Sequence, residues 1–225
     1  MWRVHAGRIQ NVEVRPATHL MSEPMESASL PGSPNLLASD GEAYFYPDFF
    51  NREESDRLFR MLTRNIAWMQ EPVIVMGKRI MQPRLTAWYG DPGRSYTYSG
   101  ITMNPHPWTP HLLFIRQQVE AASRHSFNSA LLNYYRDGKD SVGWHRDNEK
   151  SLGPNPVVAS ISFGAARTFH FRHYSDKALK QKLVLTHGSF LLMAGATQHN
   201  WLHGILKEPA ITSGRINITF RNIVQ

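Results

Sequence analysis

The 225-residue sequence contains no cysteine. Disulfide bonds and thiolate ligands are therefore excluded, and any metal must bind histidine, aspartate or glutamate side chains. No apolar run approaches the roughly 20 residues that a membrane-spanning helix needs, so no membrane association is expected. Hydrophobic residues make up 41% of the chain and charged residues 19%, which is typical of a folded domain.

Negative charge is scarce relative to positive charge, with 18 Asp and Glu against 25 Lys and Arg. The net charge of +7 favours a polyanionic partner such as nucleic acid, although a merely basic surface is the alternative. Residues 1–35 contain several prolines and serines but little hydrophobic periodicity. They are predicted to be a disordered extension, or to precede a true start at Met21 or Met25. Residues 36–225 are expected to form a single domain.

Two helices are predicted before a region rich in short strands. Residues 43–50 indicate a strand and turn, Asn51 with Glu54 caps a helix over 52–66, and Thr109-Pro110 opens a second helix. Further strands are predicted at 130–135, 157–163, 168–172, 182–186, 189–194 and 215–223. This order predicts an α+β fold in which helices buttress a β-sandwich or jelly roll.

A set of metal-binding residue types occurs in the second half of the chain. His145 and Asp147 are two residues apart, so on a strand both would point to one face, and His203 would come from a distant strand. Two imidazoles and one carboxylate form the facial triad that binds Fe(II) and leaves positions open for a co-substrate and O2. The alternatives are an ordinary hydrogen-bonded pair, or a zinc pair formed by His199 and His203 on a helix.

The segment Arg215–Arg221 alternates polar with apolar residues. As a strand it would present Arg215, Asn217, Thr219 and Arg221 on one face and bury its apolar residues on the other. Two arginines facing an interior require an anion, and a dicarboxylate would supply one through bidentate pairing. The alternative is an edge strand whose polar face is in contact with water.

Six segments resemble the AlkB family of Fe(II)- and 2-oxoglutarate-dependent dioxygenases. These are residues 133–138, 144–149, 160–164, 169–173, 187–189 and 215–221. The resemblance extends from about residue 40 to the end, and Tyr96–Gly100 with Phe169–His173 are most similar to the subgroup that repairs duplex DNA. The resemblance implies a double-stranded β-helix, with a nucleotide-recognition lid at about 68–100 and a core at about 130–225.

The resemblance also implies an activity and a set of site residues. The activity is oxidative demethylation of 1-methyladenine and 3-methylcytosine in single- or double-stranded DNA, with O2 as second co-substrate and release of formaldehyde, succinate and CO2. The implied residues are His145, Asp147 and His203 for iron; Asn133, Tyr135, Arg215, Asn217 and Arg221 for 2-oxoglutarate; and Tyr96, Ser99, Glu149, Met76, Lys78 and Arg84 for substrate.

Within the implied lid, Met76 takes the position of an aromatic wedge, or else only packs within a hairpin. Lys78, Arg79, Arg84 and Arg94 are expected to neutralise phosphates. Alternatives to DNA are RNA, a protein or a small molecule as substrate, or a non-enzymatic binding module. We expect a monomer, located in the cytoplasm in a bacterium or in the nucleus in a eukaryote.

Overall fold

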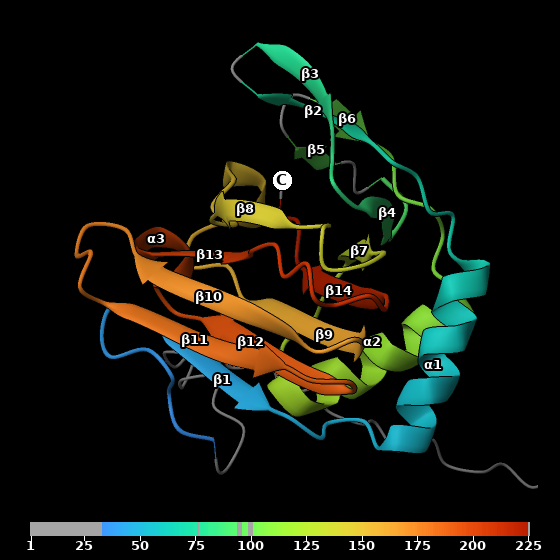
Figure 1. Ribbon diagram of the computed structural model, residues 1–225, viewed down its shortest axis with the longest axis horizontal. Helices are drawn as coiled ribbons and strands as arrows, with labels where there is room; N and C mark the ends of the chain where they lie inside the picture. Colours follow the sequence, from blue (N-terminus) through green and yellow to red (C-terminus); the bar gives the residue numbers. More distant parts are fainter. Residues whose placement is uncertain (1–32, 76, 94–95, 99–100, 225) are drawn as a thin grey trace, which may run out of the picture.

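The computed structural model consists of two antiparallel sheets that face each other, with helices on the outside (Figure 1). It describes residues 33–75, 77–93, 96–98 and 101–224. The predictions for Met76, Ser99 and Arg94, and for residues 1–32, lie outside the described residues. None of the described helices is long and apolar enough to cross a membrane.

The larger sheet has six strands in the order β1-β12-β9-β14-β7-β4, and the smaller has four in the order β11-β10-β13-β8. The larger sheet comprises β1 (Glu42–Tyr46), β12 (Ser189–Ala194), β9 (Val158–Gly164), β14 (Arg215–Arg221), β7 (Ser129–Tyr135) and β4 (Leu85–Gly90). The smaller comprises β11 (Lys180–Leu185), β10 (Arg167–His173), β13 (Trp201–Ile205) and β8 (Val142–His145). The antiparallel sandwich confirms the predicted jelly roll.

The two sheets enclose one apolar cluster, and the helices cover another on the far face of the larger sheet. In the first, Phe169 and Phe171 of β10 meet Val158 and Leu191 of β9 and β12. In the second, α1 (Arg52–Asn65) and α2 (Pro110–Ser123) pack on the sheet through residues such as Leu58. The helices therefore support the sheet that carries most of the candidate site.

Both long helices begin where the sequence predicts. Asn51 Oδ1 accepts a hydrogen bond from the Glu54 N–H at 2.9 Å, and Thr109 Oγ1 accepts one from the Leu112 N–H at 3.3 Å. Each cap satisfies a backbone donor that the first turn leaves without a partner. Two short helical segments, η1 (Lys150–Leu152) and α3 (Thr197–Asn200), complete the described helices.

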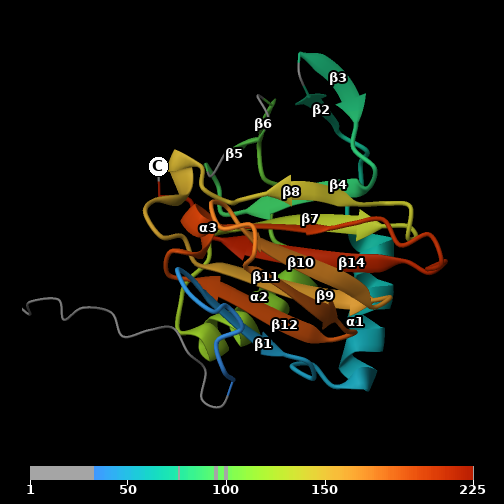
Figure 2. The same cartoon turned by 60° about the vertical axis from the view of Figure 1, so that its left-hand side comes forward.

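A hairpin of β2 (Pro72–Val75) and β3 (Lys78–Met81) projects from the sandwich, and β5 (Tyr96–Tyr98) pairs with β6 (Ile101–Met103) beside it (Figure 2). β2, β3 and β5 lie within residues 68–100, the range predicted for the lid, whereas β6 lies just beyond it. β4 lies within the predicted range 68–100 and yet pairs with β7 in the larger sheet. Alternation of apolar residues alone does not reveal which sheet a strand will join.

Two further expectations differ from the structure. β8 ends at His145, so Asp147 does not share a strand with it. Residues 33–35, assigned to the extension, belong to the domain: Ser33 Oγ donates to the Phe45 carbonyl and Asn35 Oδ1 accepts from the Ala43 N–H. These contacts attach residues 33–35 to β1, so this segment packs with the domain and not with the predicted extension.

A candidate metal and co-substrate site

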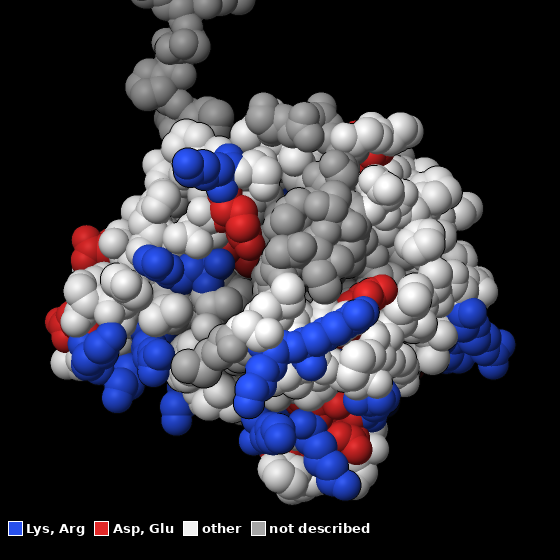
Figure 3. Space-filling model, turned by 90° about the horizontal axis from the view of Figure 1, so that it is seen from above, with Lys and Arg blue, Asp and Glu red and all other residues white. Residues whose placement is uncertain are grey.

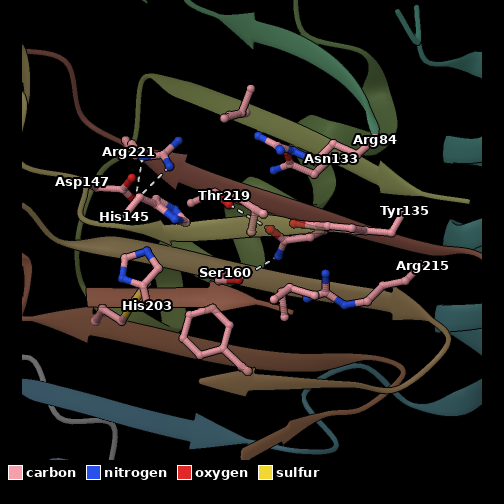
Figure 4. Close-up of a pocket in the computed structure, with 16 residues that line it drawn as sticks. Arg84, Asn133, Tyr135, His145, Asp147, Ser160, His203, Arg215, Thr219 and Arg221 are labelled. Carbon is pink, nitrogen blue, oxygen red and sulfur yellow. Dashed lines mark hydrogen bonds and ion pairs between the residues drawn. The ribbon is translucent and has the colours of Figure 1, made fainter. Parts of the chain in front are cut away.

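β14 provides the polar wall of a cavity between the two sheets. It pairs with β7 on one side and β9 on the other, so the alternative of a wet edge strand is wrong. Its polar side chains are all buried, from Arg215 at 1% exposed to Asn217 at 8%. They line the cavity together with residues of the smaller sheet (Figure 4).

His145, Asp147 and His203 meet at one end of this cavity. One potential ligand atom of each lies within 4.8 Å of the others. His203 on β13 pairs directly with His145 on β8, and their ring centroids are 4.4 Å apart. His145 Nδ1 donates to the Gly143 carbonyl at 2.8 Å, which leaves Nε2 as the nitrogen available to a metal. The structure thus brings together the three residues predicted to bind iron.

The charge state of the triad suits a divalent cation. Burial alone would raise the pKa of Asp147, but Arg221, His203 and His145 together lower that pKa to about 2. Arg221 contacts Asp147 Oδ2 through Nη2 at 2.9 Å and Nε at 3.2 Å. Burial, and then the neighbouring His145, lower the pKa of His203 to about 3. The site therefore presents an ionised carboxylate and a neutral imidazole, the forms that bind metals.

The alternative of a zinc pair formed by His199 and His203 on one helix does not fit the structure, because α3 ends at Asn200. His199 lies on α3 with an exposed side chain, whereas His203 is buried on β13. Phe169 stacks on the His203 ring at 5.4 Å between centroids and fixes its orientation within the cavity. The triad with His145 and Asp147 is the supported arrangement.

Arg215 lies at the end of the cavity away from the triad, next to Tyr135 (Figure 4). Its Nη2 donates to Ser162 Oγ at 2.9 Å, and its guanidinium carbon lies 5.2 Å from the centre of the Tyr135 ring. Its Nε and Nη1 atoms are buried with no hydrogen-bond partner among the described residues. Burial lowers the pKa of Arg215 to about 10, partly offset by Tyr135, so the group stays cationic at neutral pH.

These unpaired buried donors provide a test of the predicted co-substrate. Leaving two donors of a buried guanidinium without partners is costly, and a carboxylate is the usual bidentate partner of such a group. The cavity joins this cationic end to the triad. A dicarboxylate that chelates a metal at one end and reaches Arg215 at the other therefore fits the residues present.

Asn217 and Asn133 are both at the cavity wall, but their amides already have protein partners. Asn217 Nδ2 donates to Ser160 Oγ at 2.8 Å, and its Oδ1 accepts from Thr219 Oγ1 at 3.0 Å. Asn133 Oδ1 accepts from Arg84 Nε at 2.6 Å. These bonds fix the orientation of each amide relative to the cavity.

The expectation that Arg84 neutralises a phosphate on the surface needs correction. Arg84 is only 5% exposed, lines the cavity and also donates to the Ser141 carbonyl at 3.3 Å. It lies at the start of the segment leading into β4, where its side chain turns inward. Arg84 lies between Pro83 and the first residue of β4, so the alternation within that strand does not predict that the Arg84 side chain points inward.

The other predicted substrate residues are not gathered at one point. Lys78 is exposed on β3, and Glu149 is half-buried just before η1. The backbone of Tyr96 lies in β5, but its side chain is outside the described part of the structure. Of this group, the cavity lining contains Arg84.

Several cavity residues had not been predicted from the sequence. Ser160 of β9 lines the cavity and holds Asn217, and Met193 and Phe169 supply apolar walls. Ser162, also of β9, is not part of the lining but accepts a hydrogen bond from Arg215. The two serines occupy alternate positions of a strand that is otherwise mostly apolar, which is a signal that could have identified them. The contacts of Met193 and Phe169 depend on the packing of the two sheets and have no comparable signal.

Comparison with known proteins gives a consistent result. Residues 42–221 match the 2OG-Fe(II) oxygenase superfamily. The chain is 40% identical to alpha-ketoglutarate-dependent dioxygenase alkB homolog 3 of Bos taurus, over 91% of this chain and 78% of that protein. It is 37% identical to the DNA oxidative demethylase ALKBH2 of Homo sapiens, over 84% of this chain and 76% of that protein.

A further relative and a solved structure are also similar to this chain. The mouse alkB homolog 3 is 44% identical, but the chain covers only 65% of its length. A solved structure described as the structure of OsALKBH1 matches with a TM-score of 0.58 and 20% identity, over 80% of this chain and 97% of that one, and shows the shared fold alone. From the superfamily match and the two relatives above, the chain belongs to the AlkB family of 2OG-Fe(II) oxygenases.

Proposed function

We propose that this dioxygenase demethylates N-alkylated bases, 1-methyladenine and 3-methylcytosine, in DNA. The observation that carries the proposal is a single cavity with the His145–Asp147–His203 triad at one end and the unpaired donors of Arg215 at the other. A relative of similar length is named a DNA oxidative demethylase, which supports nucleic acid as the substrate.

In this proposal the triad binds Fe(II), and the polar face of β14 binds 2-oxoglutarate. Bound iron, 2-oxoglutarate and O2 together supply the oxidising power, which a protein side chain cannot provide. Arg215 pairs with the distal carboxylate, and Tyr135 packs against that guanidinium. Arg221, Asn133 and Asn217 line the remainder of the co-substrate position.

The residues of the protein orient the reaction and exclude water. Arg221 holds the carboxylate of Asp147 ionised, so that it remains a ligand at neutral pH. The overall reaction converts an N-methyl group, 2-oxoglutarate and O2 into the free base nitrogen, formaldehyde, succinate and CO2. Leu131 and Phe169 supply apolar walls to the cavity.

The face around the lid supports binding of a polyanion. Lys78 and Arg79 are exposed on β3, and Figure 3 shows basic side chains at several places on this face, with acidic groups between them. Arg172 lies over the Trp144 ring at 4.5 Å and Arg146 over the Tyr174 ring at 4.2 Å. Paired cations and aromatic rings are suited to phosphates and bases.

The substrate base must leave the stack before it reaches a buried cavity. We propose that Tyr96, Ser99 and Glu149 contact the extruded base, with Glu149 reading its exocyclic amino group. Met76 is proposed to be the wedge, and Lys78 to contact a phosphate. Single-stranded DNA, duplex DNA and RNA are all polyanions that this face can accept, and we propose that the protein acts as a monomer.

The proposal is tested by mass spectrometry of an oligonucleotide with one 1-methyladenine, incubated with protein, Fe(II) and 2-oxoglutarate. We expect the mass of one CH2 group to be lost only when O2 and 2-oxoglutarate are present. Single-stranded DNA, duplex DNA and RNA are compared in parallel, with Glu149→Ala as the variant expected to lose activity. Succinate formation without a change in any oligonucleotide would rule out the nucleic-acid substrate.

A further inference from the structure

The carboxylate of the triad is not held by strand pairing. β8 ends at His145, and the pairing between β8 and β13 ends there as well. Asp147 lies two residues beyond that point and is nevertheless only 3% exposed. Because ladder hydrogen bonds do not fix its backbone, other contacts must set where its carboxylate lies.

The side chain of Gln198 supplies such a contact. The Asp147 N–H donates to Gln198 Oε1 at 2.9 Å, and Gln198 is completely buried. The other end of the same amide, Nε2, donates to Met193 Sδ at 3.7 Å. The amide is thus held at both ends, and it satisfies a buried backbone donor that would otherwise lack a partner.

The position of Gln198 links the two segments that carry the ligands. Gln198 lies on α3, which leads directly into β13 and His203. The neighbouring His199 carbonyl accepts a hydrogen bond from Arg146, the residue before Asp147. α3 therefore binds the segment after β8 through two adjacent residues while it is continuous with the strand of the second histidine.

Asp147 is consequently held from both sides. Arg221 of β14 binds its carboxylate, and Gln198 of α3 binds its backbone. We propose that Gln198 is a positioning residue of the metal site, which places the Asp147 carboxylate so that it converges with the two imidazoles. The inference rests on the triad as a metal site and does not depend on a nucleic-acid substrate.

The test measures Co(II) binding to the metal-free full-length protein by visible absorption. Gln198→Met keeps the length of the side chain but removes the acceptor. We expect its dissociation constant for Co(II) to rise about 10- to 100-fold, as for other groups that orient metal ligands, and the absorption band of bound Co(II) to shift. Gln198→Glu keeps an oxygen acceptor at the same length and should recover most of the affinity.

Thr197→Val is the matched control, since Thr197 is the adjacent residue of the same helix and equally buried. Its Oγ1 accepts from the Glu42 N–H at 2.7 Å, so the variant also deprives one backbone donor of its acceptor, without touching Asp147. We expect a lower melting temperature for Thr197→Val but Co(II) affinity and absorption like those of the unmodified protein. This separates positioning of the ligand from general destabilisation of α3.

Three outcomes would overturn the inference. The first is unchanged Co(II) affinity and absorption in folded Gln198→Met, and the second is an equal loss of affinity in Thr197→Val. The third is a failure of the unmodified protein to bind Co(II), which would also refute the triad as a metal site. Co(II) binding without demethylation would refute only the proposed substrate.

If Gln198→Met does not fold, Gln198→Asn replaces it in the test. Its shorter amide cannot reach Asp147, so we expect the same loss of Co(II) affinity.

Discussion

The cavity and the β2–β3 hairpin differ in how far their residues are exposed to solvent. In the cavity, β14 is hydrogen-bonded on both sides and every one of its residues is buried. In the hairpin, all four residues of β3 are exposed, and Ile74 on β2 and Met81 on β3 are each 52% exposed. Under the proposed function, the buried interior holds the metal and the co-substrate, and the exposed hairpin contacts the nucleic acid.

The physical cost of each arrangement explains this division. Buried charges such as Arg215 and Asp147 persist only where surrounding groups hold them in place, which requires a rigid sandwich. An isolated two-stranded hairpin has little stability of its own, and its exposed apolar side chains mark a surface that binds a partner. Changes in the cavity should therefore alter turnover, and changes in the hairpin should alter substrate affinity.

The largest expected effect comes from removing the carboxylate ligand. Asp147→Ala should reduce turnover by more than about 100-fold, because even groups that only orient ligands contribute 10- to 100-fold. Succinate formation measured with saturating Fe(II) and 2-oxoglutarate tests this. Substantial residual turnover in a folded variant would show that Asp147 is not a metal ligand.

The next largest effect is expected from Arg215→Met, which should weaken the binding of 2-oxoglutarate. Loss of a charge-assisted contact of about 1.5–3 kcal/mol corresponds to a rise of roughly 10- to 100-fold in KM for 2-oxoglutarate. Arg215→Lys keeps the charge but not the planar fork of donors. Its KM for 2-oxoglutarate should therefore lie between those of the unmodified protein and Arg215→Met. If KM were unchanged in both variants, the co-substrate would not reach this end of the cavity.

The pH dependence of stability should also originate in the cavity. The pKa of His203 is about 3 in the folded protein, below an unfolded value of about 6.5, so the unfolded state binds more protons between these values. The metal-free protein should therefore lose about 2 kcal/mol between pH 6.5 and pH 5. Asp147, with a folded pKa of about 2, stabilises the protein above its unfolded pKa and loses that contribution only at much lower pH.

Urea unfolding of the metal-free protein at several pH values measures this dependence. His203→Leu should flatten the profile over this range, since it removes the buried imidazole. Lys78→Ala in the exposed hairpin should leave the profile unchanged. An unaltered slope in His203→Leu would contradict the assignment of this titration to the cavity.

The smallest effect is expected from the hairpin cations. The double variant Lys78→Ala, Arg79→Ala should weaken oligonucleotide binding. The slope of the logarithm of the binding constant against the logarithm of the salt concentration should become shallower by about one unit for each lost phosphate contact. Fluorescence anisotropy at several salt concentrations measures both quantities. Arg60→Ala with Arg64→Ala removes the same charge from exposed positions on α1 and serves as the control. Equal changes in both double variants would indicate only a general charge effect.

Local signals in the sequence were sufficient for much of the fold. Asn51 and Thr109 fix the starts of α1 and α2 through their own side chains, and short runs rich in β-branched and aromatic residues place most strands of the sandwich. The triad was also predictable: His145 and Asp147 alone are an ambiguous pair, but His203 and the arginines of 215–221 favour a metal site, and the structure brings the three residues together. These features depend on neighbours in sequence or on the chemistry of the residues themselves.

Only the tertiary structure decided how distant segments meet. It placed β4 in the larger sheet, turned Arg84 into the cavity, and left Asp147 beyond β8 where Gln198 and Arg221 hold it. The sequence by itself determined which groups are candidates to bind metal and co-substrate, since that depends on the identity of the side chains. Their geometry was decided by the packing of the two sheets, because contacts between residues far apart in the chain leave no periodic trace within either segment.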